Sequence, residues 1–134
     1  MTRTIRQTAR FHATPHEVYE ALMDAKKHAG FTGAKARIDR RVGGTFSVWD
    51  GYATGTNVRL EKDKVIVQTW RSTDFAVDAR DSKVTIRLAG VGTGTRLSFV
   101  HSGVPDELAD DIANGWKEFY WTPMRASLEK AHQT

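Results

Sequence analysis

The residues best suited to metal or acid–base chemistry are the five histidines, which are scattered along the chain. No two share one expected helix or strand at metal-ligand spacing, and His-Glu-x-x-His, Gly-x-Ser-x-Gly and phosphate-loop motifs are absent. The sequence has no cysteine, which excludes disulfides, thiolate metal sites and a cysteine nucleophile. We therefore expect no metal and no bound cofactor. For acid–base work the sequence offers two candidates, His101 and Tyr120.

Seven aromatic side chains offer a second kind of chemistry, the binding of an apolar or amphipathic small molecule. Tryptophan and tyrosine each carry an N–H or O–H that requires a partner when buried, so several together suit a partly hydrated pocket. The alternative is that each ring simply belongs to the core. With His101 beside them, the residues expected to line a ligand-sized pocket are Trp49, Tyr52, Trp70, Phe75, Trp116, Phe119 and Tyr120.

Arg71 follows Trp70 directly and has two possible roles. If its side chain points inward, it is expected to pair with an acid or with the anionic head of a ligand. If it points outward, it is a solvated or ion-paired surface residue.

Residues 106–131 predict the long helix that positions three of these rings. Leu108, Ile112, Trp116 and Phe119 recur at helical spacing, with charged residues mostly on the opposite side. The stripe indicates an amphipathic helix whose apolar face is covered by the rest of the domain. Rings this large suggest that the helix roofs a hollow.

Pro123 interrupts this helix, since it lacks a backbone N–H and predicts a bend after Trp121. Without a rotation at the bend, helix phase leaves Trp121 and Leu128 near the polar side. An exposed tryptophan beside a leucine would indicate a contact surface, such as a homodimer interface. With a rotation, both side chains turn inward.

The remainder of the chain predicts one strand, a helical segment and then a run of strands. Thr14, Pro15 and Glu17 form the start signal of the helical segment, and Gly30 is its expected stop. Gly90–Gly94 lies between two strands, which indicates a hairpin turn rather than a phosphate loop. The expected strands cover residues 4–12, 34–39, 45–49, 57–62, 64–71, 83–88 and 95–101. This order indicates an α+β fold, a curved antiparallel sheet of about six or seven strands around the C-terminal helix, with two short helices after the first strand.

Length and composition describe an ordinary globular chain. With 134 residues it forms one domain, residues 1–134. The net charge of +4 is spread along the sequence without long runs of like charge, which argues against a nucleic-acid partner. No stretch is apolar enough for a signal peptide or a membrane span, so we expect a cytoplasmic protein without membrane contact.

Several short motifs, taken in order, resemble a known family over the whole chain. They are Gly43-Gly44 with Phe46, Thr69-Trp70-Arg71, Thr95-Arg96-Leu97, Ser102-Gly103-Val104-Pro105, and Gly115-Trp116 followed by Pro123. Together they resemble the START-like (SRPBCC, Bet v 1-like) helix-grip superfamily. Within it they are similar to the AHSA-type family, named for homologues of the activator of the heat-shock-protein-90 ATPase.

The resemblance implies a helix-grip fold with a cavity for an apolar or amphipathic small molecule, although fold does not fix function. Our first expectation is a binding module that holds such a ligand between sheet and helix. One alternative is a cyclase- or hydrolase-like enzyme that uses the same cavity, and we lean against it. Another is a co-chaperone-like interaction protein. The eukaryotic co-chaperone places a separate chaperone-binding domain ahead of this module. We therefore favour contact with a chaperone less than binding of a small molecule.

Overall fold

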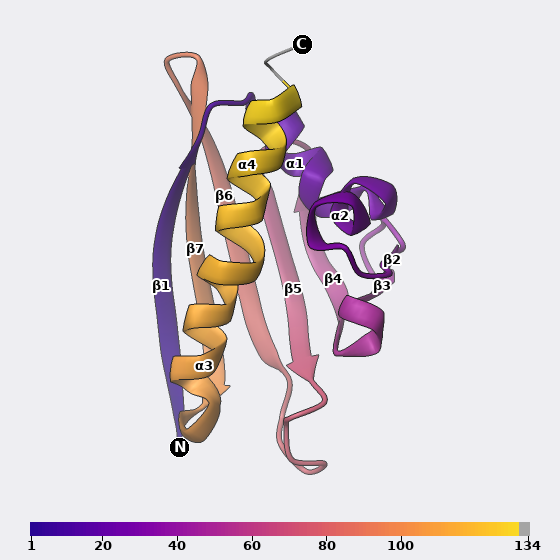
Figure 1. Ribbon diagram of the computed structural model, residues 1–134. Coiled ribbons are helices and arrows are strands. Elements are labelled where there is room, and N and C mark those ends of the chain that lie inside the picture. Colours follow the sequence, from indigo (N-terminus) through magenta and orange to yellow (C-terminus); the bar gives the residue numbers. More distant parts are fainter. Residues whose placement is uncertain (132–134) are drawn as a thin grey trace.

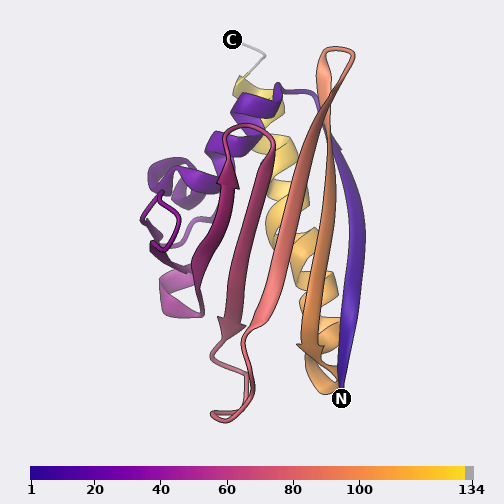
Figure 2. The same cartoon turned by 180° about the vertical axis from the view of Figure 1, so that it is seen from behind.

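The structure, a computed structural model, describes residues 1–131 and has the expected α+β architecture. One seven-stranded antiparallel sheet has the order β1-β7-β6-β5-β4-β3-β2, and the C-terminal helix packs across one face of it (Figure 1). Seen from behind, the opposite face of the sheet has no described helix over it (Figure 2). The strands are β1 (Thr2–Phe11), β2 (Arg37–Ile38), β3 (Thr45–Val48), β4 (Ala53–Glu61), β5 (Val65–Ser72), β6 (Ser82–Val91) and β7 (Gly94–Pro105).

The sheet is built by alternation and by tight turns. In β1, Ile5, Ala9 and Phe11 face the core, as their shared parity predicts. Asp63 adopts a left-handed conformation, with φ of 63°, in the turn between β4 and β5. Gly92 does the same between β6 and β7, which confirms the hairpin there. The paired strands extend to Val91 and resume at Gly94, so this turn is shorter than expected.

Two short helices follow the first strand, α1 (Pro15–Met23) and α2 (Ala25–Thr32). Thr14 caps α1, and its side chain and that of Glu17 form the predicted capping box. The expected stop at Gly30 is wrong. The first helix ends at Asp24, whose side chain caps α2, and α2 ends at Gly33 with φ of 76°, a conformation that costs glycine little.

The C-terminal helix consists of α3 (Asp106–Trp116), a π turn (Lys117–Trp121) and α4 (Thr122–Ala131). The π turn lies just before Pro123, where the sequence predicts an irregularity. A π turn holds one extra residue, so the side chains after it are rotated by about 100° relative to a continuous α-helix. His132 lies outside the described residues.

The structure takes the second of the two orientations that the sequence left open, because this rotation buries both Trp121 and Leu128 against the core. The indole N–H of Trp121 donates to Oε1 of Gln7 at 2.7 Å, and Nε2 of Gln7 donates to the carbonyl oxygen of Ala113 at 2.9 Å. Gln7, the polar exception on the dry face of β1, therefore fixes the helix on both sides of the π turn. A homodimer through the Trp121 and Leu128 side loses its basis.

Among residues 1–131, no helix combines the length and the apolar character that crossing a bilayer requires. The core fills the space between the sheet and the helices, from Ile5 and Phe11 on β1 across Val84, Leu97 and Phe99. Toward β4 and the turn that precedes it, the packing opens.

Candidate functional site

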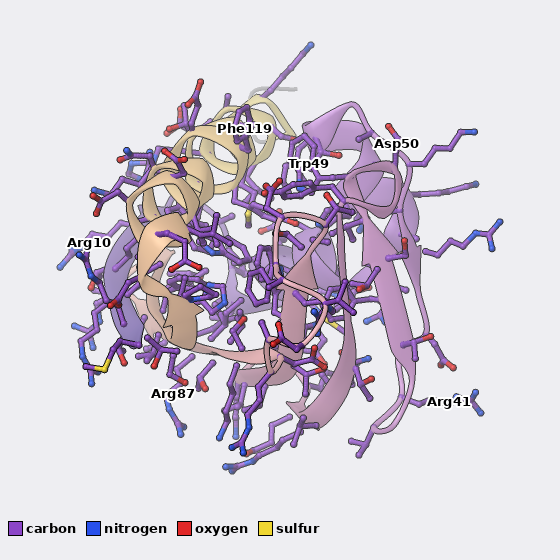
Figure 3. The ribbon with its side chains drawn as sticks, turned by 90° about the horizontal axis from the view of Figure 1, so that it is seen from below. Arg10, Arg41, Trp49, Asp50, Arg87 and Phe119 are labelled. Atoms are coloured by element: carbon purple, nitrogen blue, oxygen red, sulfur yellow. The ribbon has the colours of Figure 1, made fainter. Side chains whose placement is uncertain are left out.

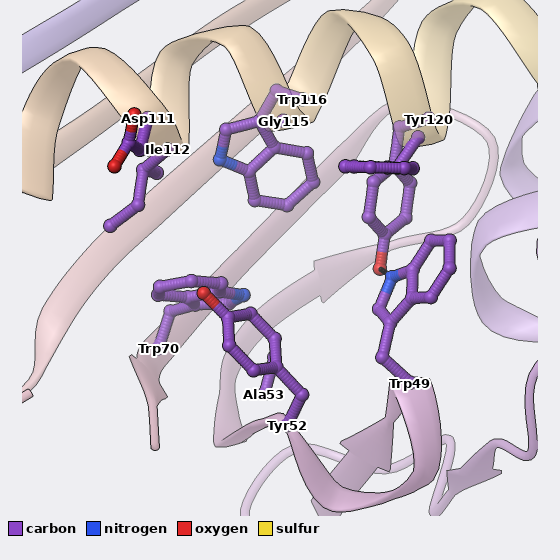
Figure 4. A pocket seen from close by; sticks show the side chains of 10 residues that line it. Trp49, Tyr52, Ala53, Trp70, Asp111, Ile112, Gly115, Trp116 and Tyr120 are labelled. Carbon is purple, nitrogen blue, oxygen red and sulfur yellow. Dashed lines mark hydrogen bonds between the residues drawn. The ribbon is translucent and has the colours of Figure 1, made fainter. Parts of the chain in front are cut away.

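A hollow of about 490 Å³ lies between α3, the π turn and the ends of β4 and β5. Its volume falls within the range of small-molecule sites in proteins. Figure 4 shows Trp116 and Tyr120 reaching down from the helix toward Trp70, Tyr52 and Trp49. The lining residues are Trp49, Tyr52, Ala53, Trp70, Asp111, Ile112, Gly115, Trp116, Phe119 and Tyr120.

Trp49 enters this hollow from a strained turn. In the 3-10 turn Trp49–Gly51, φ is 56° at Trp49 and 57° at Asp50. Both values lie in the left-handed region, which residues other than glycine rarely adopt. Each such residue costs about 1–3 kcal/mol and persists only where its surroundings hold it. Here Oδ1 of Asp50 accepts from the backbone N–H of Lys35 at 3.1 Å. Strain of this kind is typical of ligand-contacting positions, although it does not identify one by itself.

The indole of Trp49 joins a buried polar cluster on one side of the hollow. Its N–H donates to the Tyr120 hydroxyl at 3.1 Å, and that hydroxyl also hydrogen bonds Nε2 of His28 at 3.0 Å. Nδ1 of His28 is buried and has no hydrogen-bond partner among residues 1–131. Burial lowers the pKa of His28 to about 4 and raises the pKa of Tyr120, so both side chains are neutral at pH 7.

His101 belongs to a second buried cluster, behind the opposite wall. Nδ1 accepts from the Trp116 indole N–H at 3.1 Å, and Nε2 lies 2.7 Å from the Ser82 hydroxyl. That hydroxyl donates to the carbonyl oxygen of Trp70 at 2.6 Å, so it accepts the Nε2 proton of His101. Burial lowers the pKa of His101 to about 3. This histidine therefore fixes the orientation of Trp116.

The mouth of the hollow is acidic. Asp111 lies on it, at the side formed by α3, and makes no ion pair with the described residues. Across from it the Tyr52 hydroxyl donates to Oδ2 of Asp74 at 2.9 Å. Burial raises the pKa of Tyr52, and the charges of Asp74 and Asp111 raise it further. Two of the lining rings, Phe119 and Trp49, pack edge to face with ring centroids 5.5 Å apart, and Figure 3 labels them near each other.

A family model of activator of Hsp90 ATPase homolog 1-like proteins matches residues 12–129, nearly the whole chain. The chain belongs to this family. The resemblance drawn from its motifs is thereby confirmed.

Relatives of this AHSA1-like domain include longer proteins. It is 29% identical over 117 residues to an activator of 90 kDa heat shock protein ATPase homolog from Dictyostelium discoideum, a match that covers 87% of this chain and 30% of that protein. The chain spans about a third of the length of the curated relatives it matches.

Solved structures show the same fold. An HSP90 activator from Plasmodium falciparum superposes with a TM-score of 0.88 at 24% identity, and the match covers 94% of this chain and 96% of that one. The Aha1 dimer from Colwellia psychrerythraea gives a TM-score of 0.81 at 17% identity, with 95% and 96% covered. At these identities the likeness shows the fold alone.

The AHSA1-like domain brings most of the predicted aromatic residues together and leaves two aside. Phe75 packs against Trp70 with ring centroids 5.8 Å apart, outside the lining, and His101 lies behind Trp116. The predicted residues that do line the hollow are Trp49, Tyr52, Trp70, Trp116, Phe119 and Tyr120.

Sequence reasoning missed four lining residues, Ala53, Asp111, Ile112 and Gly115. Ile112 was part of the apolar helix stripe, which could have indicated it. Asp111 gave no signal, because acidic residues are common near the N-terminus of any helix.

Arg71 points away from the hollow. Its guanidinium bonds Oδ1 of Asp81 at 2.6 Å and the carbonyl oxygens of Ala76 and Ala79, so it ties down the loop between β5 and β6. Successive side chains of a strand face opposite sides, and Trp70 takes the inner one. Arg71 therefore takes the outward role that the sequence left open. Among residues 1–131, no three His, Asp or Glu side chains gather in a way that could hold a metal.

Proposed function

We propose that this AHSA1-like domain binds an apolar or amphipathic small molecule in the hollow between the sheet and the C-terminal helix. The observation that carries the proposal is the aromatic wall. Six of the ten lining residues carry aromatic rings, contributed by the segment before β4, by β5 and by the helix. Aromatic walls with a few fixed polar groups are typical of small-molecule sites.

The arrangement of hydrogen bonds supports binding over catalysis. An acid–base enzyme needs a titratable group that faces the substrate with a pKa near the working pH. Of the two candidates, His101 has both nitrogens occupied, and the Tyr120 hydroxyl is held by Trp49 and His28. Asp111 faces the hollow without a basic partner among the described residues. These groups fit the orientation of a ligand better than proton transfer to it.

Gly115 provides a direct test. A Cβ atom added there meets Phe119 Cδ2 at 3.8 Å, an ordinary van der Waals distance, and the side chain would extend into the hollow. Gly115→Leu should therefore fill the site, and it replaces a helical glycine, which favours folding by roughly 0.5–1 kcal/mol. Asn114→Leu introduces the same leucine side chain at the neighbouring, exposed position and is the matched control.

Two measurements apply to wild type and both variants. Native mass spectrometry of freshly purified protein should detect a co-purified small molecule in wild type and Asn114→Leu and not in Gly115→Leu. Calorimetric titration with dimethylbutyl benzoate, a neutral apolar ester, should show binding to the same two proteins. Equal binding by Gly115→Leu would contradict the proposal.

A second candidate function is contact with an Hsp90-type chaperone, which the family membership favours. The matched relatives are described as activators of that ATPase, although this chain spans about a third of them. Stimulation of a chaperone ATPase by wild type and by Gly115→Leu separates the two roles. Equal stimulation by both would place chaperone contact outside the hollow, and no stimulation by wild type would argue against that contact.

A further inference from the structure

The charge at the mouth narrows the class of ligand. Of the residues that line the hollow, Asp111 has the one ionisable carboxylate, and none of the described lining residues is Lys, Arg or His. Asp111 is solvent-exposed and free of ion pairs with the described residues, unlike its neighbour Asp110, which lies 3.4 Å from Arg3. An anionic ligand would find no partner here and would face a carboxylate.

A second carboxylate lies close to the hollow through its hydrogen bond to a lining residue. Asp74 accepts from the Tyr52 hydroxyl at 2.9 Å, and Tyr52 itself lines the hollow together with Asp111. The face of an aromatic ring carries partial negative charge, and cations are attracted to it. Tyr52, Trp70, Trp116 and Phe119 line the same hollow as the Asp111 carboxylate. An ammonium group placed there would meet ring faces and a carboxylate together.

An unpaired donor inside the hollow is an independent sign of a ligand. The Trp70 side chain is 6% exposed, and its indole N–H donates to none of the described residues. The other two lining indoles differ, because Trp49 donates to Tyr120 and Trp116 donates to His101. Figure 4 shows the Trp70 nitrogen on the side of the ring turned toward the interior of the hollow. The ring is buried but its nitrogen opens into the hollow, where an acceptor atom of a ligand can pair with it.

From these groups we infer that the ligand is an amphipathic cation: an apolar body with a carbonyl- or ether-type oxygen that accepts from Trp70, and an ammonium head held at the mouth by Asp111. The inference rests on the proposed function and adds the charge of the ligand to it. The overall positive charge of the protein does not oppose it, because exposed charges farther away than about 10 Å are screened at ordinary salt.

Benzoylcholine and dimethylbutyl benzoate form a matched pair of probes. They have the same shape and the same ester carbonyl, and differ in that a carbon atom replaces the ammonium nitrogen. Calorimetric titration should show benzoylcholine binding about fivefold more tightly than the neutral ester, from one partly exposed ion pair and a cation–π contact. Higher salt should reduce this preference.

Variants assign the preference to residues. Asp111→Asn should reduce the benzoylcholine preference to about twofold or less and leave the neutral ester unchanged, while Asp110→Asn, the same charge change one position away, should preserve it. Trp70→Phe should weaken both esters by a similar factor, since it removes the donor and keeps a ring.

The failures are distinguishable. Binding of the neutral ester without any preference for benzoylcholine, or a preference that survives Asp111→Asn, would overturn the cation inference and leave the proposed function standing. If neither ester binds to wild type, both are overturned.

Discussion

Two buried histidines lie on either side of the aromatic wall, and they are satisfied to different degrees. His101 on β7 has both ring nitrogens hydrogen bonded, one to Trp116 and one to Ser82. His28 on α2 has one nitrogen bonded to Tyr120, and the other is buried with no partner in the described part of the chain. Both rings are nearly inaccessible to solvent. Equal burial therefore coexists with unequal hydrogen bonding.

The difference separates a fixed side of the pocket from an adjustable one. Trp116 is held by a chain of bonds that ends on the backbone of Trp70, in the middle of the sheet. Tyr120 is held by a histidine with a free nitrogen and by Trp49, whose backbone conformation is strained. Strained backbone is found at ligand clamps and switch regions, and an unpaired nitrogen has no hydrogen bond to lose when its ring moves. If a ligand binds as proposed, we expect the movement that accommodates it on the His28 side.

The largest expected effect is that of removing His101. In His101→Leu the Trp116 N–H loses its acceptor and Ser82 loses a donor, both in a buried site. One orphaned buried donor and one lost hydrogen bond together cost about 3 kcal/mol. Urea unfolding of the variant should show a loss of that size, together with weaker ligand binding because Trp116 is no longer oriented. A loss below about 1 kcal/mol would show that the His101 network does not hold the wall.

Lowering the pH should reduce the unfolding free energy through both buried histidines. Their pKa values are lowered by burial from 6.5 to about 3 for His101 and about 4 for His28. Below pH 6.5 the unfolded chain therefore binds protons at these two histidines, whereas the folded chain keeps both neutral until the pH approaches their lowered pKa values. Their stabilisation is complete above pH 6.5 and is lost as the pH falls toward the folded values, by about 1.4 kcal/mol per pH unit for each histidine.

His28→Leu should remove one of these two contributions. Unfolding free energies at about pH 7, 6 and 5, above the usual titration range of carboxylates, measure the slope. Wild type should lose about 2.7 kcal/mol per pH unit over the lower part of this interval, and the variant about half of that. Identical slopes would mean that His28 is accessible to protons in the folded state.

Features that follow from a local sequence pattern can be predicted here, whereas features set by contacts between distant residues cannot. Alternation in β1 and the capping box at Thr14 are local, and the structure has both. Pro123 predicts an irregularity but leaves the orientation of Trp121 open, because the extra residue of the π turn that rotates it inward has no local sequence signal. The burial of His28 had no local signal. It follows from the break at Asp24, which turns α2 toward Tyr120, a residue 92 positions away in sequence.

A smaller effect is expected at Trp49. Trp49→Phe keeps an aromatic ring in the hollow and removes the donor to the Tyr120 hydroxyl, which retains His28. The side chain is half-buried, so the loss of this hydrogen bond should cost about 1 kcal/mol in urea unfolding. Trp49→Ala is the comparison that also removes the ring, and it should weaken ligand binding further. A loss in Trp49→Phe as large as in His101→Leu would contradict the distinction between the two sides.

The smallest effect is expected where the structure leaves a group unpaired. His28→Leu removes the unpartnered Nδ1 together with the imidazole that had to be desolvated, and it fills the space with an apolar side chain. It also removes one partner of the Tyr120 hydroxyl, which keeps the bond from Trp49. A buried unsatisfied polar group costs about 1–3 kcal/mol, and a typical hydrogen bond contributes about 0.5–1.5 kcal/mol. The two terms oppose each other, so at pH 7 the unfolding free energy should change by less than about 1 kcal/mol.

The same substitution therefore has opposite effects on hydrogen bonding on the two sides. In the His101 cluster it leaves a buried donor without an acceptor, and in the His28 cluster it removes a buried nitrogen that lacks a partner. Equal losses in urea unfolding for His28→Leu and His101→Leu would show that Nδ1 of His28 has a partner in solution, such as a bound water, and that both sides of the pocket are equally fixed.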